Sequence, residues 1–184
     1  MRQHGFLGSD TREQRLIEQT RNGNRDAFEC LIEPYVKLLF NYISSRVNDV
    51  YDANDIIQNT MLSIWQSIGS YKYESSFKTW AFTIARRRLA DFYRKSKKHE
   101  SLPLTDFENT PVAKNNLDES LDRMDIDNAL QHLSSSENEL VQLIFQSGLS
   151  YSEISTVLEI PIGTIKSRMS SIKSKLRILL SQEG

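Results

Sequence analysis

The chain of 184 residues contains 39% hydrophobic and 26% charged residues, with 7 Gly and 4 Pro, which is the composition of an ordinary folded protein. This composition excludes a chain that is disordered throughout, a collagen and, with a single cysteine, a disulfide scaffold. No apolar run approaches the roughly 18–20 residues that a membrane span needs, and no apolar stretch of secretory length opens the chain, so we expect a cytoplasmic protein. Cys30 is expected to be a small buried hydrophobe, and no metal site or cofactor is expected because the three histidines lack partners at metal-ligand spacing.

The net charge of −1 conceals two basic segments and one acidic segment. Residues 83–99 carry seven Lys and Arg against one Asp, and residues 140–184 carry five Lys and Arg against three Glu. Residues 100–139, between them, carry ten Asp and Glu against two Lys and Arg. One basic segment is most often a solvated surface, whereas two basic segments on helices favour contact with nucleic acid.

The N-terminal part begins with an extension, residues 1–23, to which the sequence assigns no role. The first helix is predicted from residue 26 to 47, where apolar residues recur at spacings of three and four. Its apolar positions are Phe28, Leu31, Ile32, Tyr35, Leu38, Leu39, Tyr42 and Ile43. Pro34 is expected to kink or split this helix, because proline lacks a backbone N–H and crowds the preceding turn.

Two further helices are predicted before residue 99. The second helix covers residues 52–68, with Asp52 as its N-cap and Gly69 as its end. The third helix begins near residue 76 or 78 and ends near residue 98, with arginines and lysines opposite its apolar face. No segment shows the alternation typical of strands, so the expected fold is all-α.

An acidic linker is predicted from residue 99 to 121, because prolines, asparagines and acids replace any helical period there. It is expected to be flexible. The chain then divides into two small helical domains, residues 24–98 and residues 122–184.

Two short helices open the C-terminal domain, over residues 124–133 and 136–145, where apolar residues again recur at helical spacing. Ser135 or Ser136 is expected to cap the second of them. Gly148 closes this pair of helices.

The strongest local signal is a helix-turn-helix pattern that follows. A short helix capped by Ser150 or Ser152 leads to a turn at residues 159–161, and a second helix begins near Gly163 or Thr164. The second helix carries five Lys and Arg and no acid as far as residue 180, which favours a helix that reads the major groove of DNA. The side chains suited to base edges or phosphates are Thr164, Lys166, Ser167, Arg168 and Ser171. The alternative is a helical hairpin with a solvated basic face.

An aromatic-rich turn leads directly into a basic helix within residues 69–98. Such a combination suits a single nucleic-acid strand, because bases stack on rings while Lys and Arg follow the phosphates. Tyr71 and Tyr73 are the better stacking candidates. Core packing is the alternative for Phe77, Trp80 and Phe82. We favour core packing for Trp80.

A third pattern, residues 52–65, is an amphipathic helix with Asp55, Gln58 and Asn59 on its polar side. By its chemistry alone this side is a solvated face. The sequence has no carboxylate pair in an apolar context, no Gly-rich phosphate loop and no local Ser/His/Asp signature, so we do not expect an enzyme.

These segments resemble, in order, the conserved regions of the bacterial extracytoplasmic-function sigma factors, small proteins that keep only sigma regions 2 and 4. DAF at residues 26–28 is similar to the opening of region 2.1, and DANDIIQNTMLSIW is similar to region 2.2. SFKTWAFTIARRRLADFYRK is similar to regions 2.3 and 2.4, and LSYSEISTVLEIPIGTIKSRMSSIKSKL is similar to region 4. The resemblance covers residues 24–98 and 122–180.

The resemblance implies an alternative sigma factor with three contact surfaces. The surface for the β′ clamp helices of core RNA polymerase would comprise Asp52, Asp55, Ile56, Gln58, Asn59 and Met61. The surface for the −10 promoter element, where a flipped base is captured, would comprise Tyr71, Lys72, Tyr73, Phe77, Lys78, Trp80, Arg86, Arg87, Asp91 and Arg94. The surface for the −35 element would comprise Ser150, Tyr151, Ser152, Gly163, Thr164, Lys166, Ser167, Arg168, Ser171 and Lys175.

The partners implied are core RNA polymerase through its β and β′ subunits, promoter DNA both duplex and single-stranded, and an anti-sigma factor, with no direct membrane insertion. The acidic linker resembles the one that threads toward the active-site and RNA-exit channels of the polymerase. This sequence departs from the family pattern at Asn54 and Asn59, where acids are usual, at Arg87, where Asn is common, and at Glu159, where Gly is frequent.

Two other functions fit parts of the sequence. A stand-alone helix-turn-helix regulator would dimerise or sense a ligand through its N-terminal half, and it would need a two-fold operator and no polymerase. An anti-sigma-binding decoy or a general RNA-binding protein is the third alternative. The aromatic turn beside the basic helix disfavours the regulator, because a sensor domain has no need to bind a single strand.

Overall fold

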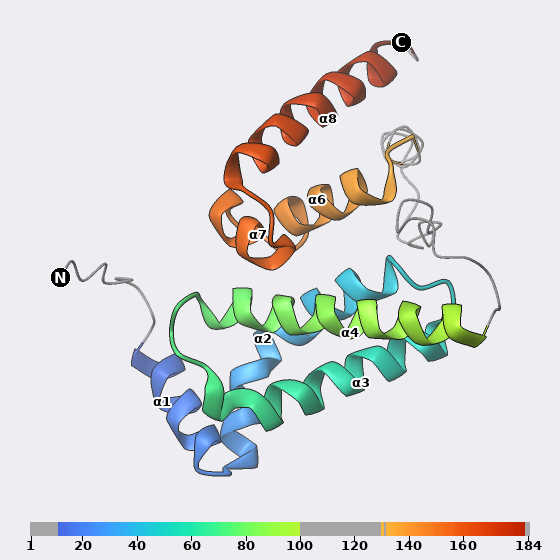
Figure 1. Ribbon diagram of the computed structural model, residues 1–184. Coiled ribbons are helices and arrows are strands. Elements are labelled where there is room, and N and C mark those ends of the chain that lie inside the picture. The colour runs from blue at the N-terminus through green and yellow to red at the C-terminus, as the bar shows by residue number, and fades with distance from the viewer. Residues whose placement is uncertain (1–10, 100–129, 131, 183–184) are drawn as a thin grey trace.

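The computed structural model describes residues 11–99, 130 and 132–182, and all the regular elements in those ranges are helices (Figure 1). The expected all-α fold is confirmed. The predicted linker and most of the predicted helix over residues 124–133 lie outside the described residues.

The N-terminal domain contains four α-helices and one short 3-10 turn. Their bounds are α1 Thr11–Arg21, α2 Arg25–Ser44, α3 Val50–Ser67, η1 Ile68–Ser70 and α4 Phe77–His99. The side chains of Leu39, Tyr42, Ile43, Ile64 and Phe82 are almost entirely buried where α2, α3 and α4 meet. The helical spacing predicts the apolar positions of α2 and α3 in this core, and core packing is the alternative interpretation of Phe82.

Several local expectations for this domain are wrong in detail. Asp49, not Asp52, caps α3, and its carboxylate accepts hydrogen bonds from the backbone N–H groups of Tyr51 and Asp52. Pro34 lies inside α2, which continues past it, so of the two expected effects, a kink or a split, the split does not occur. Cys30 is exposed rather than buried, because it lies on the outward side of α2. The N-terminal extension contains α1, a helix that the sequence does not predict.

The C-terminal domain consists, in its described part, mainly of α6 Ser135–Phe145, α7 Tyr151–Leu158 and α8 Ile162–Gln182. Capping boxes begin the first two helices, with Ser134 opposite Glu137 and Ser150 opposite Glu153. The Ser150 cap is as predicted, whereas the cap of α6 is Ser134 rather than Ser135 or Ser136.

The helix-turn-helix pattern is confirmed in its geometry. Glu159 follows α7 as its C-cap, and its φ of 58° places it in the left-handed region that a Gly adopts without strain. The apolar side of α8 is buried through Ile165, Met169 and Ile172, whose exposed fractions are at most 2%. The opposite side of α8 is therefore free to carry charge.

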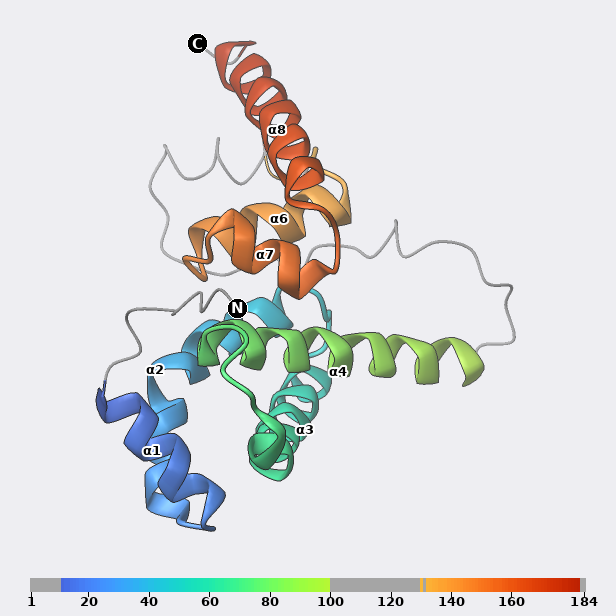
Figure 2. The same ribbon diagram turned by 60° about the vertical axis from the view of Figure 1, so that its left-hand side comes forward.

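The two domains are in contact through α4. α7 packs on the side of α4 that faces away from α3, and both ribbon views place α6, α7 and α8 beyond α4 (Figures 1 and 2). α8 runs away from the N-terminal domain toward its C-terminal end. α4 is thus a wall of the N-terminal core and the platform on which the C-terminal domain rests. Among the described helices, none is both long enough and apolar enough to span a membrane.

Candidate nucleic-acid and polymerase interfaces

The polar side of α3 is exposed. Asp55, Gln58 and Asn59 lie in solvent, and the Asn59 amide donates a hydrogen bond of 2.8 Å to the Asp55 carbonyl oxygen one turn earlier. Leu62, which the sequence does not single out, lies on the same side with an exposed fraction of 52%. Leu62 thus adds an apolar side chain to an otherwise polar exposed face.

The other residues of the predicted polymerase surface are less accessible. Asp52 is partly exposed, and Met61 packs partly against the core. Ile56 is only 4% exposed and belongs to the core, because its side of α3 faces α2 and α4. The helical period separates this buried side of α3, with Ile56, from the exposed side that carries Asp55, Gln58 and Asn59.

The aromatic turn, residues 71–76, is organised by Tyr71. The Tyr71 ring is buried, with its centroid 4.8 Å from that of Tyr73 and 5.1 Å from that of Trp80. Its hydroxyl donates a hydrogen bond of 2.7 Å to the Ser75 carbonyl oxygen, and burial raises the pKa of Tyr71 to about 12. Phe77, also predicted as a DNA contact, is fully buried at the start of α4. Tyr71 and Phe77 therefore support the turn from below.

The accessible side chains of this turn are Lys72 and Tyr73. Lys72 is exposed, and the residue Tyr73 is 37% exposed. Tyr73 has a φ of 59°, an uncommon conformation for a bulky residue. Trp80 is partly buried against the core, as the sequence favours. Tyr73 is therefore the more accessible of the two tyrosines for stacking on a base.

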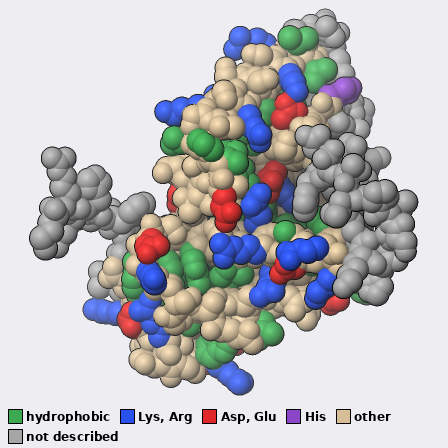
Figure 3. Space-filling model, viewed as in Figure 1, with side chains coloured by type: hydrophobic (Ala, Val, Ile, Leu, Met, Phe, Trp, Pro, Cys, Tyr) green, Lys and Arg blue, Asp and Glu red, His purple; other side chains and the backbone are tan. Residues whose placement is uncertain are grey.

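The basic side of α4 carries several ion pairs. Asp91 lies between two arginines, with Arg94 at 2.6 Å and Arg88 at 3.3 Å. Arg88 also donates a hydrogen bond of 2.7 Å to the Ser63 hydroxyl of α3. Arg87 projects into solvent, with 70% of its side chain exposed. Figure 3 shows Lys and Arg side chains interspersed with acids along the line where the C-terminal helices meet α4.

The first three turns of α8 present the predicted groove-reading side chains. Gly163, Lys166, Ser167, Arg168 and Ser171 are exposed, and Thr164 is partly exposed. Lys175 instead pairs with Glu137 of α6 at 2.5 Å. In α7, the Ser150 hydroxyl serves the cap, Tyr151 is partly buried against the core and Ser152 is exposed. The accessible cations nearest the start of α8 are Lys166 and Arg168.

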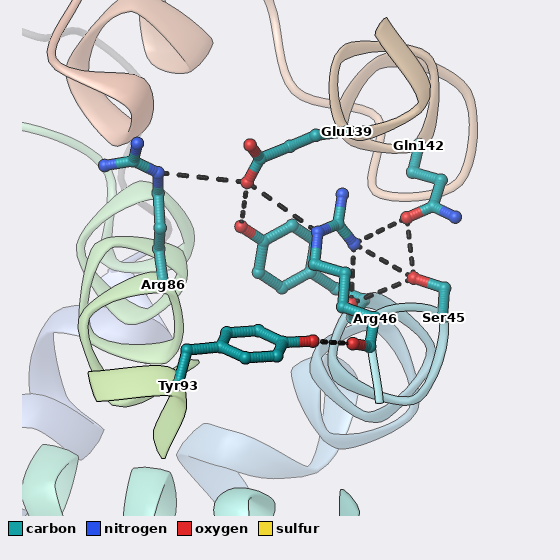
Figure 4. Close-up of polar contacts among 7 residues, drawn as sticks. Ser45, Arg46, Arg86, Tyr93, Glu139 and Gln142 are labelled. Atoms are coloured by element: carbon teal, nitrogen blue, oxygen red, sulfur yellow. Dashed lines mark hydrogen bonds and ion pairs between the residues drawn. The ribbon is translucent and has the colours of Figure 1, made fainter. Parts of the chain in front are cut away.

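A polar network joins α2 and α4 to α6 (Figure 4). A Glu139 carboxylate oxygen accepts a hydrogen bond of 2.6 Å from the Tyr42 hydroxyl and lies 3.8 Å from both Arg46 and Arg86. Arg46 and Ser45 donate hydrogen bonds of 2.6 and 2.7 Å to the Gln142 side-chain oxygen.

Two further observations complete this network. Tyr93 of α4 donates a hydrogen bond to the Arg46 carbonyl oxygen. Burial and the adjacent Glu139 carboxylate raise the pKa of Tyr42 well above its ordinary value, so its hydroxyl stays protonated and donates to Glu139.

A second network joins the start of α4 to α7. A Glu153 carboxylate oxygen accepts hydrogen bonds of 2.9 Å from both Ser76 and Thr79. Lys78 donates a hydrogen bond of 3.2 Å to the Gly148 carbonyl oxygen, and Arg87 lies 3.5 Å from Glu159. Burial alone would raise the pKa of Glu153, but hydrogen bonds from Ser150, Ser76 and Thr79 outweigh it and lower the pKa.

The first network borders a cavity of about 320 Å³ between the domains. Leu89 and Tyr93 of α4 line one wall, and Glu139, Leu158 and Arg168 contribute to the other. Three residues predicted to contact the −10 element, Lys78, Arg86 and Arg87, are therefore engaged with the C-terminal domain in this arrangement. Within the described ranges, no group of three or more His, Cys, Asp or Glu is placed to hold a metal ion.

Comparisons with known proteins agree with the two-domain organisation. Residues 31–99 match the family description "Sigma-70 region 2", and residues 123–176 match "Sigma-70, region 4". The ECF RNA polymerase sigma factor SigL of Mycobacterium tuberculosis is 30% identical over 160 residues, covering 84% of this chain and 89% of SigL. SigW of Bacillus subtilis, also an ECF RNA polymerase sigma factor, is 24% identical over 173 residues, covering 88% of this chain and 92% of SigW.

Solved structures show the same fold. The sigma factor RpoE of Bartonella quintana, crystallised with the anti-sigma factor NepR, superposes with a TM-score of 0.64 at 28% identity, covering 84% of this chain and 96% of that one. CnrH, solved with the cytosolic domain of CnrY, superposes with a TM-score of 0.67 at 21% identity, covering 94% of this chain and 99% of that one.

Proposed function

Because this chain belongs to the extracytoplasmic-function sigma factors, which direct RNA polymerase to specific promoters, we propose that its exposed residues divide this task among three surfaces. One surface binds core polymerase, one captures the −10 element and one reads the −35 element. Sigma factors are not enzymes, and the chemistry of RNA synthesis belongs to the polymerase. A stand-alone regulator is not favoured, since it would have no use for region 2. We place this promoter-directed initiation in the cytoplasm, where bacterial RNA polymerase binds its promoters.

The polymerase surface is the α3 polar face, which we define as Asp55, Gln58, Asn59 and Leu62. All four side chains are exposed, and they lie within two turns of one another on one side of the helix. The apolar anchor is Leu62, while Asp55 supplies charge complementary to a basic partner surface. Asp52 lies one turn before Asp55 at the edge of this face. The partner is the β′ subunit of core polymerase.

The −10 surface is the exposed ring of Tyr73 together with Lys72 and the basic side of α4. Tyr73 offers a face for a flipped base, and Lys72 lies beside it to meet a phosphate. Arg86, Arg87 and Arg94 line the adjoining helix, where they meet the edge of the duplex. We call residues 71–76 the −10 loop. Tyr71, Phe77 and Trp80 pack beneath this loop and support it.

The −35 surface is the start of α8. Ser167, Ser171 and Thr164 lie on the side opposite the buried Ile165 and Met169, and Lys166 and Arg168 lie on the two flanks of that side. The free N–H groups at the start of α8 suit a phosphate, and Arg168 has the geometry to bind a guanine edge with two hydrogen bonds. Lys175 contributes to the fold of the domain through Glu137 rather than to recognition.

Binding both promoter elements requires the two domains to separate. In the arrangement described above, which we call closed, Arg86 and Arg87 lie 3.8 and 3.5 Å from Glu139 and Glu159 of the C-terminal domain, so these acids compete with phosphates for the two guanidinium groups. Pairs this exposed contribute little stability, on the order of 0–1 kcal/mol each. Separation also breaks the hydrogen bonds of Glu139 with Tyr42 and of Glu153 with Ser76 and Thr79, so binding to core polymerase and promoter must outweigh their loss. An anti-sigma factor, of the kind solved with RpoE, is the proposed inhibitory partner.

The observation that carries the residue assignments is the exposure of Tyr73 and Arg168 on two elements that match sigma regions 2 and 4. The test adds the purified protein to sigma-free bacterial core polymerase and sequences the transcripts that begin on fragmented host DNA. Discrete new start sites that share two upstream boxes are expected. No new start sites, with duplex DNA binding intact, would contradict the proposal and favour the stand-alone regulator.

A further inference from the structure

One helix takes no part in the three proposed surfaces. α1 precedes residue 31, where the match to region 2 begins. Its Ile17 side chain is fully buried, and the helix packs against α2 and against η1, the turn that leads into the −10 loop. Figure 2 shows α1 beside α2 at the edge of the N-terminal domain.

Arg21, the last residue of α1, binds both ends of the chain segment that enters the −10 loop. Its Nε donates a hydrogen bond of 3.3 Å to the Ile68 carbonyl oxygen, and its Nη2 donates to the Tyr71 carbonyl oxygen. Its Nη1 pairs with Glu18 at 2.6 Å. A guanidinium group with several fixed donors can hold two carbonyls and a carboxylate at once, which an ammonium group cannot do with the same geometry.

Glu18 connects this cluster to Tyr73. The Glu18 Oε1 atom that pairs with Arg21 also accepts a hydrogen bond of 2.9 Å from the Tyr73 hydroxyl. The Arg21 guanidinium lies 5.2 Å from the centroid of the Tyr73 ring, within cation–π distance. Glu18, Arg21 and Tyr73 thus form a closed set of contacts, which we call the α1 brace.

The −10 loop needs such a brace because of its backbone. Tyr73 is one of two non-glycine residues with positive φ among the described residues, and a bulky side chain adopts that conformation only where surrounding contacts hold it. The contacts within the loop, from Tyr71 to Ser75, do not involve the Tyr73 hydroxyl. The α1 brace supplies its partner.

We propose that Glu18 and Arg21 are positioning residues that hold Tyr73 and the −10 loop in the shape that captures a flipped base. The inference rests on the proposed function of the loop and extends it to a helix outside the matched region. The brace acts through Tyr73, and α1 need not touch DNA. Its effect is preorganisation: the loop is ordered before the strand arrives, so binding does not have to order it.

The test uses holoenzyme, formed with core polymerase, on a promoter whose non-template −10 strand is already unpaired. A series of strands, each with one abasic position, identifies the base whose removal weakens binding by the wild-type holoenzyme. Arg21→Ala removes the brace, and Arg21→Lys keeps the charge but not the fork of donors. Tyr73→Phe removes only the hydroxyl. The matched control is Arg15→Ala, which removes an exposed cation of the same helix. Thermal unfolding and core-polymerase affinity are measured for each variant.

Arg21→Ala is expected to weaken binding of the intact strand about tenfold, the size expected for loss of a charge-assisted hydrogen-bond set, with Tyr73→Phe and Arg21→Lys showing smaller losses. On the strand that lacks the captured base, all variants are expected to match wild type. Arg15→Ala is expected to match wild type on both strands.

Three results would overturn the inference. If Arg21→Ala and Tyr73→Phe bind the intact strand as wild type does, the brace does not position the loop. If their defect is equally large on the abasic strand, the effect is general destabilisation. If no abasic position affects wild-type binding, the loop captures no base, and the proposed function of the loop falls together with the inference. Should Arg21→Ala fail to fold, Tyr73→Phe decides.

Discussion

The Thr79 hydroxyl of α4 donates a hydrogen bond of 2.9 Å to the Glu153 carboxylate, which also closes the capping box of α7. A single side chain therefore begins the first helix of the helix-turn-helix and attaches it to the N-terminal domain. The start of α4, next to the −10 loop, and the start of α7 are held together by this contact. Changes in its protonation should affect both the C-terminal domain and its docking.

Acid is expected to weaken the closed arrangement through Glu153. Its pKa is below the ordinary 4.5, so its stabilising contribution is complete above that value and is lost as pH falls through the lower, folded-state pKa. Thermal unfolding measured between about pH 6 and pH 3 should show stability falling below about pH 4.5. Glu153→Gln should flatten that part of the profile. An unchanged profile in this variant would exclude Glu153 as its source.

Glu139→Ala is expected to shift the protein toward separated domains. The change leaves the buried Tyr42 hydroxyl without its acceptor in the closed form, at a cost of about 1–3 kcal/mol, which separation relieves by hydration. The exposed native Cys30 and a cysteine introduced by Ser170→Cys give two labelling sites, one in each domain, for a spin-label or fluorescence distance measurement.

The control for this measurement is Glu33→Ala, which removes an exposed acid of α2 far from α6 along the chain. A distance distribution that broadens equally in both variants would show that Glu139 does not hold the domains together.

Arg168→Ala is expected to weaken −35 recognition by about 1–3 kcal/mol, the value of a two-hydrogen-bond contact to a base. Binding by holoenzyme is compared on the promoter and on the same fragment with a scrambled −35 element. Arg177→Ala, an exposed cation two to three turns further along α8, serves as the control and should lose little. If Arg168→Ala loses the same binding affinity on both fragments, Arg168 contacts only a phosphate and does not read a base.

Asp55→Lys is expected to lower affinity for core polymerase by about tenfold or more, because it places a like charge against a basic partner surface. The measurement is holoenzyme formation, by competition or fluorescence anisotropy, with promoter-independent duplex binding as a second readout. Glu29→Lys makes the same charge reversal on the exposed side of α2 and should have little effect. If Asp55→Lys leaves transcription intact, α3 does not form the polymerase contact.

The sequence predicts best the features that are encoded locally. The helix-turn-helix is recognisable because Ser150, Glu159 and Pro161 mark its cap, turn and second start within a dozen residues. The α3 polar face follows from the helical period, although the period alone did not indicate that Leu62 would lie exposed within it. The cap of α3 was misplaced by three residues because both Asp49 and Asp52 are suitable caps.

Long-range relationships could not be predicted from local pattern. Tyr42 and Glu139 are 97 positions apart, and neither has a neighbour in sequence that indicates the other. The sequence does not predict α1 because this segment is mostly polar, with apolar side chains at only two adjacent positions, Leu16 and Ile17. The role of Arg21 could not be predicted either, because the carbonyl oxygens to which it donates hydrogen bonds are about 50 positions away in the sequence. Cys30 was expected to be buried from its apolar neighbours, but the turn of α2 directs it outward.

One face of α4 has two proposed roles. Arg86 and Arg87 face the C-terminal domain in the closed form, and the same two side chains are proposed to lie against promoter DNA in the working form. A substitution that changes which −10 sequence is preferred will therefore also change how readily the protein opens. Promoter preference and the contact between the domains therefore depend on the same face of α4, where Glu139 and Glu159 compete with DNA for the two arginines.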